Sequence, residues 1–334
     1  MKGIMNLGNT CCINSFIQCL NTIAPIIEYI KKDLSVPDST ITHELQDVIN
    51  ALQDTNPGVL SPQRFVRAIH MKFAAWVSPG QQLDIHELWS LIMDTIDEEN
   101  KATSKAAIKQ KELNISNIDK NTSLGQFYVL AETNWFDKVR LSAWSDITKW
   151  LFVSQVQCKN PACQKIYHNF ESFSELSIPI DAASSAVSIQ SCVDEYFKPE
   201  VLEGWRCDDC KECGNAEKVM RIWRAPNVAA VALKRTKVTE AGALIKIMTP
   251  VNIDESLSLT KWSIHPDEKL RSCTFVLQSI GLHNGNINGG HYRAASTVGN
   301  VWNVIDDDSI GSIPDKTNIL QNNSAAYMLF YTAE

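Results

Sequence analysis

The sequence has 334 residues and contains no long uninterrupted apolar run. A membrane-spanning helix needs about 20 consecutive residues that are mainly apolar, so we expect no membrane insertion. The N-terminus also lacks the apolar core of a secretory signal, because Asn6, Asn9, Asn14 and Gln18 interrupt it. These absences predict an intracellular protein, located in the cytoplasm, the nucleus or both.

The chain lacks an excess of positive charge. Lys and Arg total 31 against 38 Asp and Glu, which gives a formal net charge of −7 and a pI near 5.6. A protein without an overall basic field holds phosphates poorly, so we expect no nucleic acid partner. The acidic balance is instead compatible with a basic protein or peptide partner, and it makes no prediction about oligomeric state.

Internal repeats and low-complexity tracts are also absent. Apolar residues at three- and four-residue spacing predict helices at 17–20, 43–49 and 87–93. Shorter apolar runs predict strands from about residue 150 onward, at 151–153, 228–233, 275–277, 301–305 and 327–331. Helices followed by strands indicate an α+β fold. The polar, Lys-rich residues 100–123 are expected to form a surface helix or a connection.

Ten cysteines are present, and intracellular surroundings keep thiols reduced. They are therefore predicted to be metal ligands, a catalytic thiol or small buried residues. In a helix over residues 11–24, Cys11 falls on a polar stripe with Ser15 and Gln18, whereas Cys12 falls on the apolar arc. The positive end of a helix favours a thiolate. Cys11 is thus a candidate nucleophile, with plain packing as the alternative for both cysteines.

A nucleophilic thiol needs a base, and His291 is the candidate. It follows the glycine-rich residues 281–290, which we expect to form a loop that reaches a cleft. Residues 291–296 and 301–306 are predicted to form a hairpin around a turn at 298–300, which would put His291 beside Asp306. A carboxylate there would orient the imidazole. An exposed hairpin with incidental polar ends is the alternative.

Three segments resemble motifs of the ubiquitin-specific proteases. Residues 3–20, GIMNLGNTCCINSFIQCL, resemble the cysteine box of that family. Residues 289–292, GGHY, together with 302–307, WNVIDD, resemble its histidine box, and residues 82–88, QLDIHEL, resemble a helical motif between the two. The resemblance implies a papain-like cysteine protease fold, α+β, with thumb, fingers and palm parts.

The family layout implies one catalytic domain over residues 1–334. A helical thumb would reach to about residue 125, the fingers would span about 145–225, and the palm would span about 226–334. By motif position Cys11 is the nucleophile, His291 the base and Asp306 the residue that orients it. Asn6 stands where the family has an amide that stabilises the oxyanion, and Asp307 would assist in a role not separable from that of Asp306.

The implied substrate is ubiquitin, which would enter by its Arg-Leu-Arg-Gly-Gly tail. Its arginines need carboxylates, and Asp84 and Glu87 share one face near a helix start. Gln82 precedes them where the family has a glutamine. Favourable acidic residues at a helix N-terminus are the alternative for this pair. For the whole chain, the alternatives are a protease for a ubiquitin-like modifier and a catalytically inactive ubiquitin-binding scaffold.

No catalytic cofactor is implied, but two cysteine pairs lie in the middle of the chain. Four thiolates from Cys158, Cys163, Cys207 and Cys210 would hold a structural zinc ion tetrahedrally. The resembling family carries two such pairs at the tip of its fingers, although the first pair here has a wider gap. A fingers region that keeps the cysteines without the metal is the alternative.

Three residues depart from the family pattern. Cys12 stands where an aromatic residue, commonly tyrosine, is usual, Leu88 replaces a frequent phenylalanine, and Thr236 also replaces an aromatic residue. None of these changes removes a predicted catalytic group.

Overall fold

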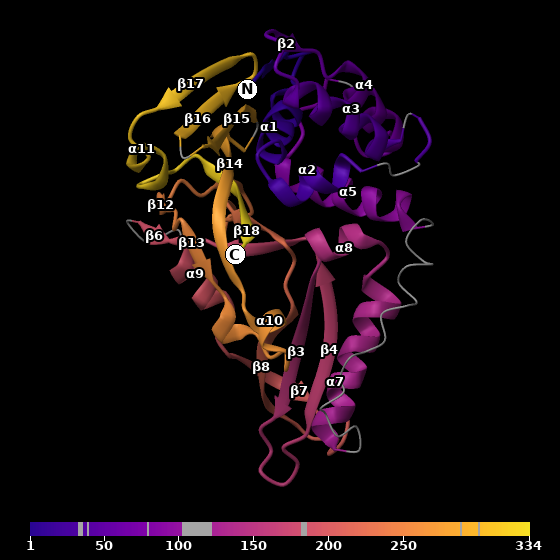
Figure 1. Ribbon diagram of the computed structural model, residues 1–334. Coiled ribbons are helices and arrows are strands. Elements are labelled where there is room, and N and C mark those ends of the chain that lie inside the picture. The colour runs from indigo at the N-terminus through magenta and orange to yellow at the C-terminus, as the bar shows by residue number, and fades with distance from the viewer. Residues whose placement is uncertain are drawn as a thin grey trace.

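The computed structural model describes residues 1–32, 36–38, 40–78, 80–101, 122–181, 186–287, 289–299 and 301–334. The N-terminal helices and part of a large sheet lie beside each other at one end of the molecule, and a narrower sheet extends to the other end (Figure 1). The predicted α+β class is therefore confirmed. Most of the polar segment 100–123 lies outside the described residues.

The N-terminal third is mainly helical, as the apolar spacing predicts. Its first helix ends at Leu20 rather than near residue 24, because Pro25 begins a new helix in the first turn, where its missing amide hydrogen is not needed. The helices are α1 (Cys11–Leu20), α2 (Ala24–Ile30), α3 (Ile41–Gln53), α4 (Gln63–Lys72) and α5 (Ile85–Glu99). The short strands β1 (Gly3–Ile4) and β2 (Val59–Leu60) pair in parallel beside them.

A second helical segment links this part to the narrower sheet. It consists of α7 (Ser123–Asn134), the π-helix η1 (Trp135–Val139) and α8 (Ala143–Thr148). The sheet has the order β4-β3-β8-β7, and all its neighbouring strands are antiparallel. Its strands are β3 (Trp150–Cys158), β4 (Ile166–Phe173), β7 (Glu200–Arg206) and β8 (Cys213–Arg224).

The large sheet has the order β17-β16-β15-β14-β18-β9-β5, with β13 also paired to β14. Only β5 runs parallel to its neighbour in this sheet. The strands are β5 (Glu175–Pro179), β9 (Val228–Lys234), β13 (Ser256–Ser258), β14 (Thr274–Asn286), β15 (Gly289–Val298), β16 (Val301–Asp306), β17 (Ser309–Ile313) and β18 (Ala326–Ala333).

Smaller elements surround the large sheet. They are β6 (Val187–Ser188), α9 (Ile189–Tyr196), β10 (Thr236–Val238), β11 (Leu244–Lys246), β12 (Val251–Asn252), the 3-10 helix η2 (Thr260–Trp262), α10 (Glu268–Arg271) and α11 (Thr317–Leu320). No helix among the described residues is both long enough and apolar enough to cross a membrane.

Two expectations about the histidine segment are wrong in detail. Residues 281–290 are not a loop, because β14 and β15 run through them as a tight hairpin in which Asn284 pairs with His291. The next hairpin is offset by two residues from the expected register, since Val298 pairs directly with Val301. His291 and Asp306 are consequently diagonal neighbours, a separation that long side chains still bridge.

Helix α1 lies in the core between the other helices and the sheet strands β14 and β15. All ten of its residues are buried, including those of the polar stripe. Gln18 is 1% exposed and donates to the carbonyl of Lys2 at 2.8 Å. The N-terminal segment therefore covers the polar side of this helix and provides hydrogen-bond partners for some of its polar side chains.

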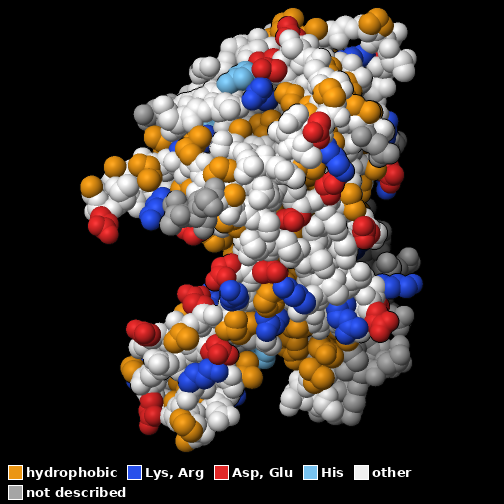
Figure 2. Space-filling view, turned by 90° about the vertical axis from the view of Figure 1, so that its left-hand side faces the viewer, with side chains coloured by type: hydrophobic (Ala, Val, Ile, Leu, Met, Phe, Trp, Pro, Cys, Tyr) orange, Lys and Arg blue, Asp and Glu red, His pale blue; other side chains and the backbone are white. Residues whose placement is uncertain are grey.

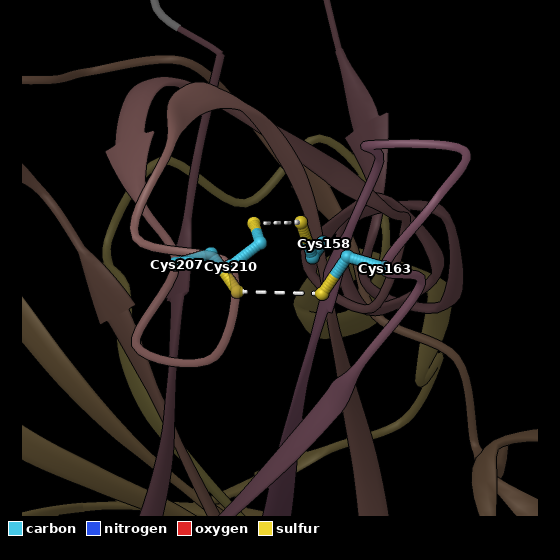
Figure 3. Close-up of side chains that lie close together, drawn as sticks. All are labelled: Cys158, Cys163, Cys207 and Cys210. Carbon is cyan, nitrogen blue, oxygen red and sulfur yellow. Dashed lines mark hydrogen bonds between the residues drawn. The ribbon is translucent and has the colours of Figure 1, made fainter.

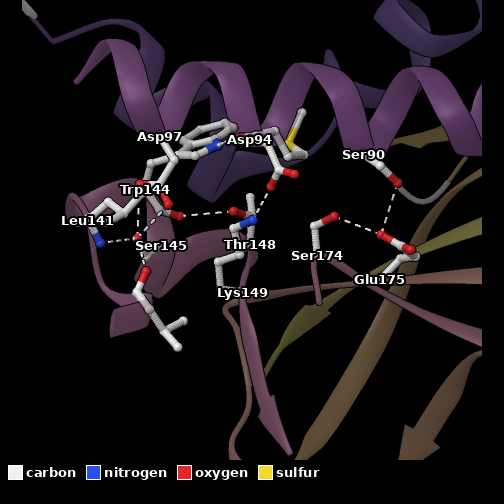
Figure 4. A network of polar contacts seen from close by, with 12 residues as sticks. Ser90, Asp94, Asp97, Leu141, Trp144, Ser145, Thr148, Lys149, Ser174 and Glu175 are labelled. Atoms are coloured by element: carbon white, nitrogen blue, oxygen red, sulfur yellow. Dashed lines mark hydrogen bonds and ion pairs between the residues drawn. The ribbon is translucent and has the colours of Figure 1, made fainter. Parts of the chain in front are cut away.

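Helix α5 contacts both α8 and the large sheet (Figure 4). Near its C-terminal end, the Asp97 carboxylate accepts from Ser145 Oγ at 2.8 Å. Near its middle, Ser90 Oγ donates to Glu175 Oε2 at 3.2 Å, at the start of β5. These contacts consequently fix the position of the α5 N-terminus relative to the large sheet.

Candidate active site

Cys11 is the first residue of α1 and is 4% exposed. Thr10 precedes it as the N-cap residue, but its hydroxyl accepts from the Leu7 amide instead of capping the helix. The unpaired amide groups of a first helical turn stabilise a negative charge placed there. The structure therefore puts Cys11 at the start of the helix, as expected from the sequence.

Cys12, by contrast, is fully buried. Burial, reinforced by the nearby carboxylate of Asp84, raises the pKa of the Cys12 thiol well above its usual value. A thiol in that state is a poor nucleophile. The two adjacent cysteines thus differ sharply in their surroundings.

His291 and Asp306 are in direct contact. Nε2 of His291 lies 2.6 Å from Oδ1 of Asp306, and each side chain is a little under half exposed. This contact leaves Nδ1 of the imidazole to face another group. A carboxylate bonded to one ring nitrogen fixes the tautomer, so the other nitrogen is ready to take a proton.

Asp307 plays a different structural part from Asp306. Its Oδ2 accepts from Nδ2 of Asn6 at 2.8 Å. The Oδ1 atom of Asn6 accepts from the amides of Gly8 at 2.9 Å and Thr10 at 3.3 Å. Both ends of the Asn6 amide are therefore fixed, and one hydrogen of its NH₂ group remains for a further acceptor.

Gln82 joins the start of α5 to the segments that carry Cys11 and His291. Its Nε2 donates to the carbonyl of Gly290 and lies 3.8 Å from the sulfur of Cys11, while its Oε1 accepts from the Gly290 amide at 3.0 Å. A side chain at residue 290 would meet the Asn284 carbonyl oxygen at 2.4 Å, so only glycine fits there. Gln82, expected from the resemblance to bind the substrate tail, consequently also lies next to the sulfur of Cys11.

Asp84 is the N-cap of α5. Its Oδ1 accepts from the amides of His86 at 2.8 Å and Glu87 at 3.3 Å. Its Oδ2 accepts from the hydroxyls of Tyr327 at 2.5 Å and Tyr292 at 3.4 Å. Asp84 therefore caps the helix N-terminus, as the alternative explanation for this acidic pair expected. Glu87 is exposed.

A cavity of about 210 Å³ opens beside these residues. On its far side, Nζ of Lys246 lies 2.8 Å from Nδ1 of His283. Burial, with the nearby Lys246 cation, lowers the pKa of His283 to about 4, so this imidazole is neutral and accepts the hydrogen bond. The lining comprises Gln82, Leu83, Asp84, Thr236, Lys246, His283, Asn286, Ile287, Gly289, Tyr292 and Tyr327.

The four cysteines of the narrower sheet come together at its far end (Figure 3). Sulfur atoms of Cys158 and Cys210 are 4.0 Å apart, and those of Cys163 and Cys207 are 3.7 Å apart. Four thiolates around one zinc ion at about 2.3 Å would be separated by roughly 3.8 Å. The donor set and its spacing therefore fit a tetrahedral zinc ion.

Three side-chain contacts in the candidate site were not predicted from the sequence. Asn14 donates to Oδ1 of Asp307 at 2.8 Å, and the two tyrosines, Tyr292 and Tyr327, hold Asp84. Only Tyr292 could have been suspected from the sequence, because it directly follows the candidate base His291. Nothing in the spacing of Asn14 or Tyr327 pointed to a partner so far away in sequence.

A thiol at a helix start, joined through Gln82 to the segment that carries an imidazole held by a carboxylate, has the layout of a thiol protease. The sequence profile of the family described as ubiquitin carboxyl-terminal hydrolase matches residues 2–331. The chain belongs to this family.

Curated relatives include the ubiquitin carboxyl-terminal hydrolase Usp2 of Drosophila melanogaster and a probable ubiquitin carboxyl-terminal hydrolase 4 of Schizosaccharomyces pombe. Each is 26% identical over 98% of this chain, which covers 34% and 58% of their respective lengths. The chain therefore spans between about a third and three fifths of these relatives.

Among solved structures, the chain resembles the SAGA Ubp8/Sgf11/Sus1/Sgf73 DUB module bound to ubiquitin aldehyde. The TM-score is 0.73 at 22% identity, with 100% of this chain and 70% of that chain covered. The same module bound to monoubiquitin gives a TM-score of 0.75 at 20% identity, covering 100% and 69%. These likenesses support the expected thumb, fingers and palm fold.

Proposed function

We propose that this protein is a deubiquitinase that hydrolyses the isopeptide or peptide bond after the C-terminal glycine of ubiquitin. The observation that carries the proposal is the junction of three segments: Gln82 touches both Cys11 and Gly290, and His291 follows with its ring fixed by Asp306. The family membership of the chain supports the same chemistry.

In this mechanism His291 takes the thiol proton of Cys11, and the thiolate attacks the glycyl carbonyl carbon. Asn6 donates to the developing oxyanion, a contact worth roughly 2.7–4 kcal/mol in other enzymes. The protonated His291 then gives its proton to the leaving amine, which leaves a thioester. Water, deprotonated by the same imidazole, attacks the thioester and regenerates the free thiol.

The shape of the molecule supports a globular substrate with an extended tail. Figure 2 shows a deep hollow in one edge, between an upper projection and the lower end formed by the narrower sheet. The cavity beside Asp84 would receive the tail, and Glu87 at the same helix start would meet one of its arginines. Because Asp84 already accepts four hydrogen bonds, we assign the arginine contact chiefly to Glu87.

We further propose a structural zinc ion held by the four cysteines, with no catalytic cofactor. Cys213 is exposed and lies outside this cluster, which makes it a matched control. Purified protein should contain one equivalent of zinc by elemental mass spectrometry. The double variant Cys207→Ser/Cys210→Ser should contain none, and Cys213→Ser should keep its full content. Zinc retained by the double variant would contradict the assignment.

The division into a thumb to about residue 125, fingers over about 145–225 and a palm over about 226–334, within one catalytic domain, also stays a proposal. So does the intracellular location. Limited proteolysis that cuts repeatedly near the proposed boundaries, while leaving each part intact, would support the division.

The direct test of function is hydrolysis of a ubiquitin–fluorophore conjugate. Wild-type protein should release the fluorophore, Cys11→Ser should lose all activity, and Cys12→Ser should keep most of it. The reverse outcome for the two cysteines would overturn the assignment of the nucleophile. Parallel rates on conjugates of ubiquitin-like modifiers separate the main alternative. A folded wild-type protein that cleaves none of them would favour the inactive scaffold.

A further inference from the structure

Asn14 lies in the second turn of α1 and is 1% exposed. Its Nδ2 donates to Oδ1 of Asp307 at 2.8 Å and lies 3.3 Å from the Met5 carbonyl oxygen. Asp307 follows β16, almost three hundred residues later in the chain. A buried amide that donates to a carboxylate makes a strong, directional contact.

The Asp307 carboxylate is shared between two amides. Asn14 occupies one oxygen and Asn6 occupies the other, each at 2.8 Å. A carboxylate held at only one oxygen can rotate, whereas two opposed donors fix its plane. Asn14 therefore helps to hold the carboxylate to which the NH₂ group of Asn6 donates.

The backbone at Asp307 is also fixed by contacts with the N-terminal segment. Its φ is +52°, a conformation that residues other than glycine seldom adopt. Its carbonyl oxygen accepts from the Ile4 amide at 2.8 Å, and a Cβ at Gly3 would lie 2.2 Å from the Asp308 carbonyl oxygen. Unfavourable conformations persist where surrounding contacts enforce them, and they cluster at functional sites.

Asn6 itself lies outside any helix or strand and is exposed. Its position therefore depends on side-chain contacts rather than on regular structure. We propose that Asn14 is a positioning residue that acts through Asp307 to hold the Asn6 amide toward the oxyanion. The inference rests on the proposed function, and it separates the two acidic residues: Asp306 orients the imidazole, and Asp307 orients the amide.

The test compares Asn14→Ala with Gln18→Ala. Gln18 is a matched control, because it is an equally buried amide on the same helix that also donates to the N-terminal segment, at Lys2, without contacting Asp307. With the ubiquitin–fluorophore conjugate, Asn14→Ala should lower kcat by about ten- to a hundredfold with KM little changed. Gln18→Ala should leave kcat within about twofold of wild type even where it lowers the melting temperature as much.

A double-mutant cycle distinguishes positioning from general damage. In an Asn6→Ala background, Asn14→Ala should have almost no further effect on kcat, because the amide that it positions is gone. The rate of Cys11 alkylation by iodoacetamide should be unchanged in Asn14→Ala, since that reaction forms no oxyanion. Additive losses in kcat, or alkylation that slows in parallel with kcat, would overturn the proposal.

Asp307→Asn provides a second variant that keeps the side-chain shape if Asn14→Ala does not fold. It should also lower kcat, and again only when Asn6 is present. Failure of the proposed function shows itself separately, as a wild-type protein without activity. An active wild type whose Asn14→Ala and Asp307→Asn variants match the Gln18→Ala control would refute the positioning role alone.

Discussion

The contact between His86 and Glu175 provides a quantitative test of how α5 is held on the large sheet. Nε2 of His86 lies 3.1 Å from Oε1 of Glu175, while Ser174 Oγ donates to Oε2 at 2.7 Å. Replacing His86 by alanine removes one hydrogen bond to a charged acceptor, worth about 1.5–3 kcal/mol when buried. Because the imidazole is about a third exposed, we expect about 1–2 kcal/mol.

The pH dependence of this effect has a definite sign. The hydrogen bond to Glu175 raises the pKa of His86, so the stabilisation is complete below the ordinary histidine pKa of about 6.5 and is lost as pH rises through the raised value. Burial alone would raise the pKa of Glu175, but hydrogen bonds from His86 and Ser174 leave it lowered. Its contribution is present above the ordinary glutamate pKa of about 4.3 and is lost at lower pH.

Melting temperatures of wild type and His86→Ala, measured from pH 5 to pH 9, test this reasoning. The difference should be largest near pH 5–6.5, at roughly 1–2 °C per kcal/mol, and should shrink at alkaline pH. With Glu175→Gln as the background, the effect of His86→Ala should be much smaller at every pH. A difference that is constant or grows with pH would refute the ion-pair explanation.

Three further predictions concern other parts of the molecule. Asp306→Ala should lower kcat on the ubiquitin–fluorophore conjugate by about a thousandfold or more, because the imidazole loses the partner that fixes its tautomer; activity near wild type would exclude that role. Cys12→Ser buries a hydroxyl in place of a thiol and should destabilise the fold by about 1–3 kcal/mol while most activity remains; denaturant titration checks the first part and the conjugate assay the second. Glu132→Ala should lower the free energy of unfolding by about 3–5 kcal/mol in a denaturant titration, since Arg224 would lose its buried partner. A decrease as small as that expected on breaking the exposed ion pair of Glu195 and Lys198 would contradict this prediction.

Much of the fold was accessible from local patterns. The helical spacing located α1, α3 and α5, and the apolar runs located β3, β9, β14, β16 and β18. Alternation and spacing report which residues share a face, but they do not fix register. The hairpin register was consequently off by two residues, because His291 opposite Asp306 would place Ser296 opposite Val301, whereas Val298 pairs with Val301.

Contacts between distant segments were less accessible. The predicted meeting of His291 and Asp306 came from a hairpin, which is a local structure. The contact between Asn14 and Asp307 joins the two ends of the chain, and no periodicity encodes it. The segment that covers the polar stripe of α1 was not predicted either, because these N-terminal residues have no distinctive pattern of their own.

The central claim is that Cys11 is the nucleophile of a ubiquitin-directed thiol protease. Incubation of the folded protein with ubiquitin that carries a C-terminal electrophile, followed by intact-mass analysis and peptide mapping, tests this claim most directly. The account predicts a single adduct of one ubiquitin on Cys11, absent from Cys11→Ser and present in Cys12→Ser. An unlabelled wild-type protein, or an adduct on Cys12 or another cysteine, would contradict it.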